Sequence, residues 1–130
     1  MFSFGQKSTE HLQDVNPDLV KVMLEAIKQS PYDFSITQGV RTVEQQQALF
    51  NAGKSQTMRS RHLSGNAVDI AILENGKITW EFDRYNTVAA HIKAVAKSMD
   101  IPVEWGGDWL SFKDGPHFQL NKGKYPDERG

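Results

Sequence analysis

An acidic residue interrupts an apolar run, and the rest of the sequence offers it partners. Residues 67–72, AVDIAI, have the composition of a buried strand but include a carboxylate at Asp69. A buried carboxylate is costly unless a cation, a set of hydrogen bonds or a metal ion lies beside it. His62 precedes it by seven positions, and His117 opens a second apolar stretch three residues after Asp114. Two histidines and an acid, with a spare acid nearby, are the inventory of a hydrolytic zinc site.

Such a site would hold Zn²⁺ through His62, Asp69 and His117 and would leave one coordination position for water. The ion would offset the charge of Asp69 and bring the pKa of the water toward neutrality. A weak base such as Asp114 could then complete the deprotonation. The chain has no cysteine, so histidine and carboxylate are the only strong zinc ligands available.

Plainer interpretations stay open at this point. Asp69 could be a core acid that pairs with Arg41 or Arg61, and His62 or His117 alone could be an ordinary hydrogen-bonded histidine. Arg41 follows a predicted strand and precedes a predicted helix, a place where functional side chains are common. A surface or ion-paired arginine is an equally good interpretation of that position.

Four other residues of suitable type are set aside. His11 and His91 lie in or near polar helical segments, where solvent exposure is expected. Ser60 and Ser64 flank the first histidine, but no Gly-x-Ser-x-Gly elbow surrounds them, which argues against a serine nucleophile.

Composition is that of one ordinary globular domain. The chain has 130 residues, 38% hydrophobic and 24% charged residues, and a formal net charge of -1. The sequence has no stripe of basic residues, so it gives no reason to expect a nucleic-acid partner. The sequence has no apolar segment typical of a signal peptide or of a stable membrane association, so we expect synthesis in the cytoplasm. We also expect a monomer.

The pattern of apolar residues, caps and turns predicts an α+β fold with a small antiparallel sheet flanked by helices. Asn16-Pro17 begins one helix, the Thr42 and Gln45 capping box begins another, and Asn75-Gly76 predicts a hairpin. We expect one domain over residues 1–120 and a frayed polar tail over residues 121–130. The expected helices span about 17–29, 43–53 and 84–99, the strands about 34–38, 67–73, 77–80, 103–105 and 117–120, and a loop covers 54–60.

The paired segments SRHLSGNAVDIA and DGPHFQL are similar to two signatures of the peptidase M15 family, S-x-H-x-x-G-x-A-x-D and (E/D)-x-x-H. That family includes D-Ala-D-Ala carboxypeptidases and dipeptidases. SPYDFSITQGVRT and VEWGGDW resemble more closely the phage endolysins that cleave the L-alanyl-D-glutamate bond of peptidoglycan. The similarity extends from Phe4 to about Leu120.

The resemblance implies a role for each candidate residue. His62, Asp69 and His117 would bind zinc, and Asp114 would be the general base, a position where many carboxypeptidase members have glutamate. Arg41 would bind substrate and stabilise the oxyanion. The implied fold is the hedgehog/D-Ala-D-Ala-peptidase-like one, a small antiparallel sheet with flanking helices.

The implied function is that of a zinc-dependent phage endolysin that hydrolyses the L-alanyl-D-glutamate bond of the peptidoglycan stem peptide. Such an enzyme is made in the host cytoplasm and acts at the cell wall after the membrane is permeabilised. Two alternatives remain open: a D-Ala-D-Ala carboxypeptidase or dipeptidase of cell-wall metabolism, and a non-catalytic zinc-containing binding module on the same fold.

Overall fold

The computed structural model describes residues 2–53, 61–110 and 113–126. The expected helices and strands are confirmed with small shifts of their ends, whereas the expected loop over 54–60 lies outside the described residues. One short N-terminal helix, α1, was not expected. In the described part of the chain, no helix is both long and apolar enough to cross a membrane. The elements are α1 Gln6–His11, α2 Pro17–Lys28, β1 Asp33–Gln38, α3 Val43–Asn51, β2 Ala67–Glu74, β3 Lys77–Thr79, α4 Phe82–Ser98, β4 Val103–Trp105, the 3-10 turn η1 Gly106–Asp108 and β5 His117–Leu120.

Local side-chain chemistry sets where the helices begin. The Asn16 side chain accepts a hydrogen bond from the backbone N–H of Asp18 at 2.9 Å and caps α2, which has proline in its first turn. Thr42 and Gln45 form the predicted capping box at the start of α3. The β2–β3 hairpin turns at two residues with positive φ, as the Asn-Gly pair predicts.

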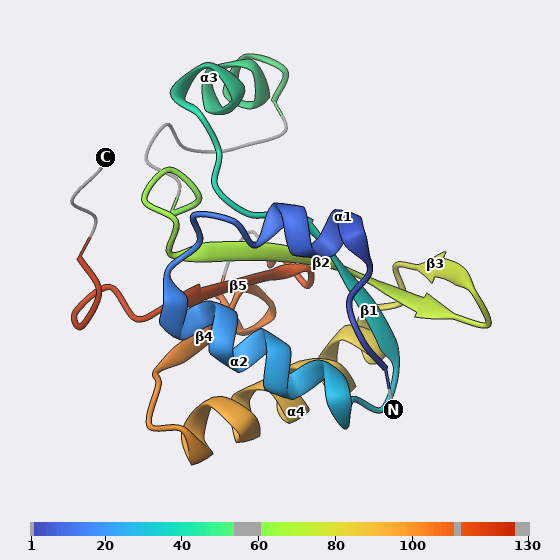
Figure 1. The fold of residues 1–130 in the computed structure, drawn as a ribbon. Helices are drawn as coiled ribbons and strands as arrows, with labels where there is room; N and C mark the ends of the chain where they lie inside the picture. The colour runs from blue at the N-terminus through green and yellow to red at the C-terminus, as the bar shows by residue number, and fades with distance from the viewer. Residues whose placement is uncertain (1, 54–60, 111–112, 127–130) are drawn as a thin grey trace.

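The sheet is antiparallel and has the order β1-β2-β5-β4, with β3 paired to β2 (Figure 1). The first half of β2 pairs with β5 and the second half with β3, so both lie along the same edge of β2. This is the predicted α+β architecture. Strand β2 pairs directly with β1, β3 and β5.

The two faces of β2 have different surroundings: one packs in the hydrophobic core and the other carries Asp69. Val68, Ile70 and Ile72 belong to the hydrophobic core, which α2 and α4 cover on one side of the sheet (Figure 1). Side chains alternate along a strand, so Asp69 points to the opposite face, away from these helices. The core-facing side chains of β2 therefore fix the direction in which the Asp69 carboxylate points.

The expectation of a frayed tail after Leu120 is wrong for the part that the structure describes. Arg61 donates from Nη2 to the Tyr125 carbonyl at 2.7 Å, and the Tyr125 hydroxyl donates to Asp18 at 2.6 Å. The Tyr125 ring is partly buried against the core. One aromatic side chain in a polar segment thus holds the chain against the domain beyond the last strand.

Tyr85 joins the hairpin to the core. Its hydroxyl accepts from the backbone N–H of Ile72 at 3.1 Å and donates to the Thr79 carbonyl at 2.9 Å, in a side chain that is only 2% exposed. We predict that Tyr85→Phe lowers the free energy of unfolding by about 1 to 3 kcal/mol, because the buried N–H of Ile72 and the partly buried carbonyl of Thr79 lose their partner. Urea denaturation measures this. Tyr32→Phe, at a partly buried ring outside this junction, should change it by less than about 0.5 kcal/mol; equal effects would contradict the assignment.

Candidate metal centre

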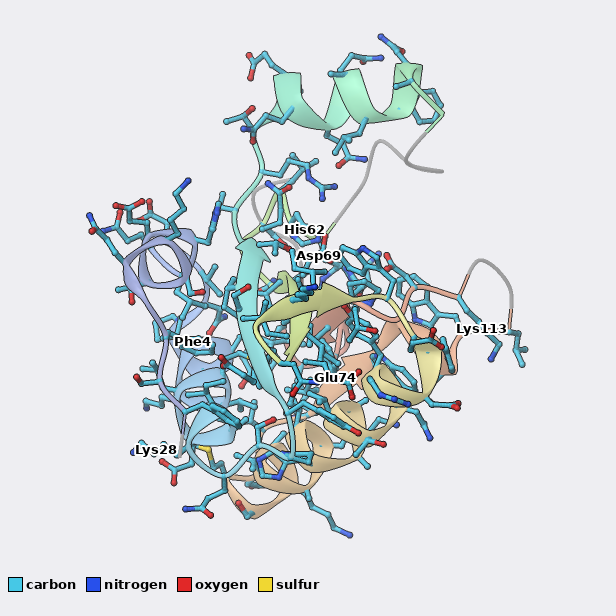
Figure 2. All side chains as sticks on the ribbon, turned by 90° about the vertical axis from the view of Figure 1, so that its right-hand side faces the viewer. Phe4, Lys28, His62, Asp69, Glu74 and Lys113 are labelled. Atoms are coloured by element: carbon cyan, nitrogen blue, oxygen red, sulfur yellow. The ribbon has the colours of Figure 1, made fainter. Side chains whose placement is uncertain are left out.

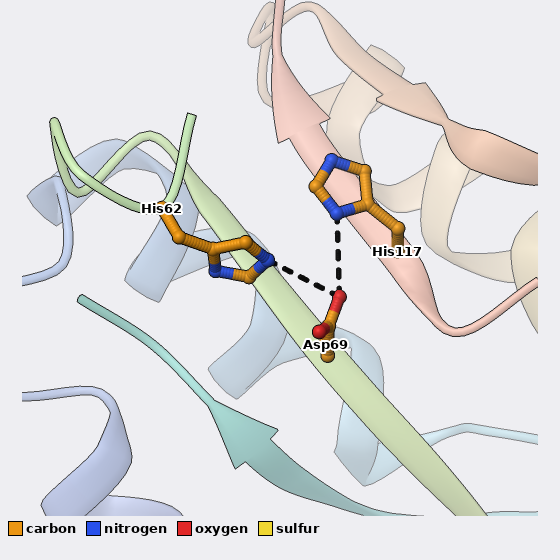
Figure 3. Close-up of side chains that lie close together, drawn as sticks. All are labelled: His62, Asp69 and His117. Atoms are coloured by element: carbon orange, nitrogen blue, oxygen red, sulfur yellow. Dashed lines mark hydrogen bonds and ion pairs between the residues drawn. The ribbon is translucent and has the colours of Figure 1, made fainter. Parts of the chain in front are cut away.

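His62, Asp69 and His117 converge on one point, as Figure 3 shows. His62 Nε2 lies 3.3 Å and His117 Nδ1 lies 3.2 Å from the same oxygen of Asp69, Oδ1. One potential ligand atom from each residue lies within 4.8 Å of the other two. Both imidazoles are buried, at 2% and 6% exposure, and their ring centroids are 5.1 Å apart. Residues far apart in the sequence therefore form one compact cluster of donors.

Strand register brings the second histidine to the acid. Asp69 on β2 and His117 on β5 are directly opposite each other in the antiparallel pair. Residues that face each other across such a pair have Cβ atoms roughly 5 Å apart on the same face of the sheet. The core residues that set the β2 register therefore also set the distance between these two groups.

A closed turn before β2 brings in the first histidine. The Asn66 N–H donates to the Arg61 carbonyl at 3.1 Å, and Gly65 takes a φ of +79° that favours glycine. The Arg41 N–H donates to the His62 carbonyl at 2.9 Å, which ties this turn to the end of β1. Figure 2 shows His62 and Asp69 close together between α3 and the sheet.

The orientation of the His62 ring follows from one hydrogen bond. Its Nδ1 lies 2.9 Å from the Gly39 carbonyl, which can only accept. In the neutral imidazole Nδ1 therefore carries the proton, and Nε2, the nitrogen that faces Asp69, is left to bind a metal ion. A Cβ at position 39 would lie 1.8 Å from the His11 carbonyl oxygen. Glycine is therefore required at the residue that orients this imidazole.

The charges of the cluster act strongly on one another. Burial alone would raise the pKa of Asp69, but hydrogen bonds and charges from His117 and His62 hold it far below its usual range. Burial would lower the pKa of His117, but Asp69 raises it above the usual value. The carboxylate is thus ionised at neutral pH, as a metal ligand has to be.

Asp114 lies in the same electrostatic environment with the opposite outcome. Burial raises the pKa of its carboxyl, the charge of Asp69 raises it further, and His117, His62 and Arg41 oppose these effects only in part. The two carboxyl groups therefore differ in how readily they take up a proton. Such a separation is typical of a pair in which one acid binds and the other transfers protons.

Arg41 borders the cluster from the turn after β1. Its Nη1 donates to Gln46 Oε1 at 2.6 Å, and its Nη2 lies 3.7 Å from Asp69 Oδ2. Burial lowers the pKa of Arg41, and the charge of Asp69 opposes this. Of the two arginines considered as partners for the buried acid, Arg41 lies next to it, whereas Arg61 bonds to the Tyr125 carbonyl.

The segment between β4 and β5 holds Asp114 against the site. The Asp114 N–H donates to the Gly106 carbonyl at 3.1 Å, and the His117 N–H donates to the Asp114 carbonyl at 3.2 Å. A Cβ on Gly106 would lie 2.4 Å from the Asp114 carbonyl oxygen, so only glycine permits this close approach. The Trp109 ring packs against His117, with 5.2 Å between ring centroids.

The residues set aside from the sequence lie outside the cluster. His11 is exposed, and the half-buried His91 bonds through Nε2 to the Ala26 carbonyl at 2.8 Å, which corrects the expectation that it is exposed. The Ser64 hydroxyl donates to the Arg61 carbonyl. Ser60 lies outside the described residues.

Three residues next to the cluster were missed from the sequence: Gly39, Gln46 and Gln119. Gln119 is two positions after His117 and its Oε1 lies 2.8 Å from His117 Nε2. Strand alternation would have placed it on the same face as the histidine. Gln46 is one of three consecutive glutamines, and only the phase of the helix separates it from its neighbours. Gly39 acts through its backbone, which leaves no side-chain signal.

The donor set fits a metal ion of the zinc type. It offers two imidazole nitrogens and one ionised carboxylate oxygen, and zinc sites of hydrolases use such sets of three. Each imidazole has its other nitrogen next to an oxygen, Gly39 carbonyl for His62 and Gln119 Oε1 for His117. Outer partners of this kind orient the ligand nitrogen of metal-binding histidines.

Comparison with known proteins gives the family. The family model described as phage L-alanyl-D-glutamate peptidase matches residues 1–127. The chain belongs to this family. A relative named L-alanyl-D-glutamate peptidase, from Escherichia phage T5, is 36% identical over 128 residues, which cover 95% of this chain and 93% of the relative. These matches confirm the resemblance to phage endolysin peptidases that the sequence motifs indicated. The chain is an enzyme of this peptidase family.

Solved structures agree on the fold. The Serratia marcescens L-Ala D-Glu endopeptidase ChiX superposes with a TM-score of 0.90 at 44% identity, over 96% of this chain and 94% of that one. The D,D-dipeptidase VanXYg superposes with a TM-score of 0.54 at 14% identity, over 82% of this chain and 50% of that one. The second match shows the shared fold alone, which confirms the predicted D-Ala-D-Ala-peptidase-like architecture.

If the cluster binds a metal ion, His117→Ala should remove it. The variant loses a donor from a set of three, so we expect about one ion per chain in the parent protein and a small fraction of that in the variant. Elemental analysis after desalting measures the content. His11→Ala is the control: it removes an exposed histidine outside the cluster and should keep the full metal content. Equal metal content in the two variants would contradict the ligand assignment.

Proposed function

We propose that this chain is a zinc-dependent endolysin that hydrolyses the L-alanyl-D-glutamate bond of the peptidoglycan stem peptide and so lyses the host cell wall. The observation that supports it most directly is the convergence of His62, Asp69 and His117 in a chain of this family. The names of the phage T5 relative and of ChiX support the choice of bond.

His62, Asp69 and His117 are the proposed zinc ligands. Bound zinc would supply a Lewis acid that polarises the scissile carbonyl and acidifies a water molecule. The protein itself would contribute two neutral imidazole nitrogens and one ionised carboxylate in a fixed arrangement. The Gly39 and Gln119 oxygens fix the two rings, and the low pKa of Asp69 keeps its carboxylate charged.

Asp114 is the proposed general base. Its carboxyl would take the proton of the attacking water and deliver it to the leaving amine nitrogen of the glutamate. A carboxyl with a raised pKa holds that proton better between the two transfers, and burial together with Asp69 raises the pKa of Asp114. The backbone bonds to Gly106 and His117 keep this acid next to the ligands.

Arg41 is the proposed substrate and oxyanion contact. A guanidinium can bind a carboxylate through two nitrogens at once, and stem peptides are anionic. Gln46 holds Nη1, which limits the freedom of the arginine before substrate arrives. Positive charge placed in advance where negative charge develops lowers the barrier without reorganisation.

The cellular setting remains a set of predictions. We expect synthesis in the host cytoplasm, action at the wall after the membrane is permeabilised, and a monomer without nucleic-acid or stable membrane partners. The near-neutral formal charge of -1 supports the absence of a nucleic-acid partner.

Product analysis tests the proposed bond. Purified protein incubated with peptidoglycan should release peptides that begin with D-glutamate and leave L-alanine on the muramic acid, as mass spectrometry of the digested muropeptides would show. Release of terminal D-alanine instead would favour the carboxypeptidase alternative. No new products from a metal-replete protein would favour the binding module.

Asp114→Asn should separate binding from chemistry. The amide keeps the size of the side chain but cannot accept the proton, so we predict a loss of about 10²- to 10⁴-fold in kcat with the zinc content unchanged. Asp108→Asn is the matched control, because Asp108 is an exposed acid that pairs with Lys93. A zinc-replete Asp114→Asn variant with the parent rate would remove Asp114 from the role of base.

A further inference from the structure

Gln119 contacts the outer nitrogen of His117. The two residues are two positions apart on β5, so their side chains share one face of the sheet. Gln119 Oε1 lies 2.8 Å from His117 Nε2, while His117 Nδ1 lies 3.2 Å from Asp69 Oδ1. The glutamine therefore lies on the far side of the imidazole from the proposed metal.

A carboxylate on the neighbouring strand holds the glutamine in turn. Glu104 on β4 is directly opposite Gln119 in the antiparallel pair. Gln119 Nε2 donates to Glu104 Oε1 at 3.3 Å, and Asn121 Nδ2 donates to the other oxygen, Oε2, at 2.9 Å. Both oxygens of this carboxylate are thus engaged by amide donors.

This arrangement decides which way the Gln119 amide points. The two ends of an amide look alike in coordinates and are told apart by their hydrogen-bond partners. With the amide reversed, its oxygen would face the Glu104 carboxylate, and two acceptors would be in contact. Glu104 therefore requires the amide oxygen to face His117.

The amide oxygen decides where the imidazole proton lies. An oxygen of this kind only accepts, so the His117 nitrogen that faces it, Nε2, is the one that donates. A neutral imidazole has one N–H, which leaves the lone pair on Nδ1, directed at Asp69. The chain of three side chains thus selects the ligand nitrogen.

We infer that Gln119 is a positioning residue that keeps the proton of His117 on Nε2 and presents Nδ1 to the metal, and that Glu104 acts through Gln119. The inference rests on the proposed metal site and adds a part to it that neither the family signatures nor the donor cluster contain. The Gly39 backbone carbonyl fixes the proton of His62 in the same way, and no side-chain substitution can remove it. The proton of His117 is fixed by side chains, so this role can be tested by substitution.

Gln119→Leu removes the acceptor and keeps a side chain of similar length. Loss of an outer partner of a metal-binding histidine typically lowers metal affinity about 10- to 100-fold, and we expect a loss of this size in zinc affinity, measured by competition with a chromogenic chelator. In the zinc-loaded protein, the His117 Nε2–H resonance should lose its protection from exchange with water in proton–nitrogen NMR spectra. The matched control is Gln6→Leu, which removes an exposed glutamine that donates to Glu10 at 3.2 Å on α1 and should leave both readouts unchanged.

An exchange of the two side chains provides a second test. In the double variant Gln119→Glu with Glu104→Gln, a carboxylate at 119 still accepts from His117 and an amide at 104 still donates to it. We expect zinc affinity within about two-fold of the parent and a protected Nε2–H resonance. This variant keeps the overall charge and the polar pair, so it also decides the matter if the leucine variant does not fold.

The outcomes separate this inference from the proposed function. Parent-like zinc affinity in a folded Gln119→Leu protein, or loss of the protected resonance in the exchanged variant, would overturn the role of Gln119. Neither result would affect the peptide bond assigned by product analysis. A parent protein that binds no zinc would overturn both the inference and the zinc-dependent mechanism.

Discussion

The charge of Asp69, a partly buried acid in the middle of the sheet, is the constraint on which the rest of the site depends. An ionised carboxylate inside a sheet is stable only with positive or donating groups close to it. Three elements far apart in the chain supply them: the turn before β2 brings His62, β5 brings His117, and the turn after β1 brings Arg41, which lies 3.7 Å away. The fold thus brings these three segments together around one acid.

The hydrophobic core controls this acid indirectly. Val68, Ile70 and Ile72 occupy one face of β2 in the core, and the alternation of the strand then sends Asp69 to the other face. A slip by one residue would exchange the two faces, bury the acid among α2 and α4 and expose the apolar side chains. The energy that fixes the register is hydrophobic, although the site itself is polar.

How far the sequence predicts the site depends on the range of each interaction. The capping box at Thr42 and the Asn75-Gly76 turn are local signals, and the structure confirms the elements that they predict. The acid at Asp69 in an apolar run is also a local signal, and both candidate histidines lie beside it. The choice between an ion pair and a metal cluster stayed open because it depends on the β2–β5 register, a long-range property. The packing of Tyr125 and the helix α1 were missed for similar reasons: each depends on distant contacts and not on a periodic pattern of its own.

The two histidines show two physical solutions to the same problem. A carbonyl of the backbone fixes the His62 proton, and the position of that carbonyl depends on a glycine whose Cβ would lie 1.8 Å from another backbone oxygen. A side-chain amide fixes the His117 proton, and its orientation depends on a carboxylate one strand further out. The first solution tolerates no side chain at position 39. The second needs an acceptor at position 119 that faces the imidazole and a partner at position 104 that fixes the direction of that acceptor.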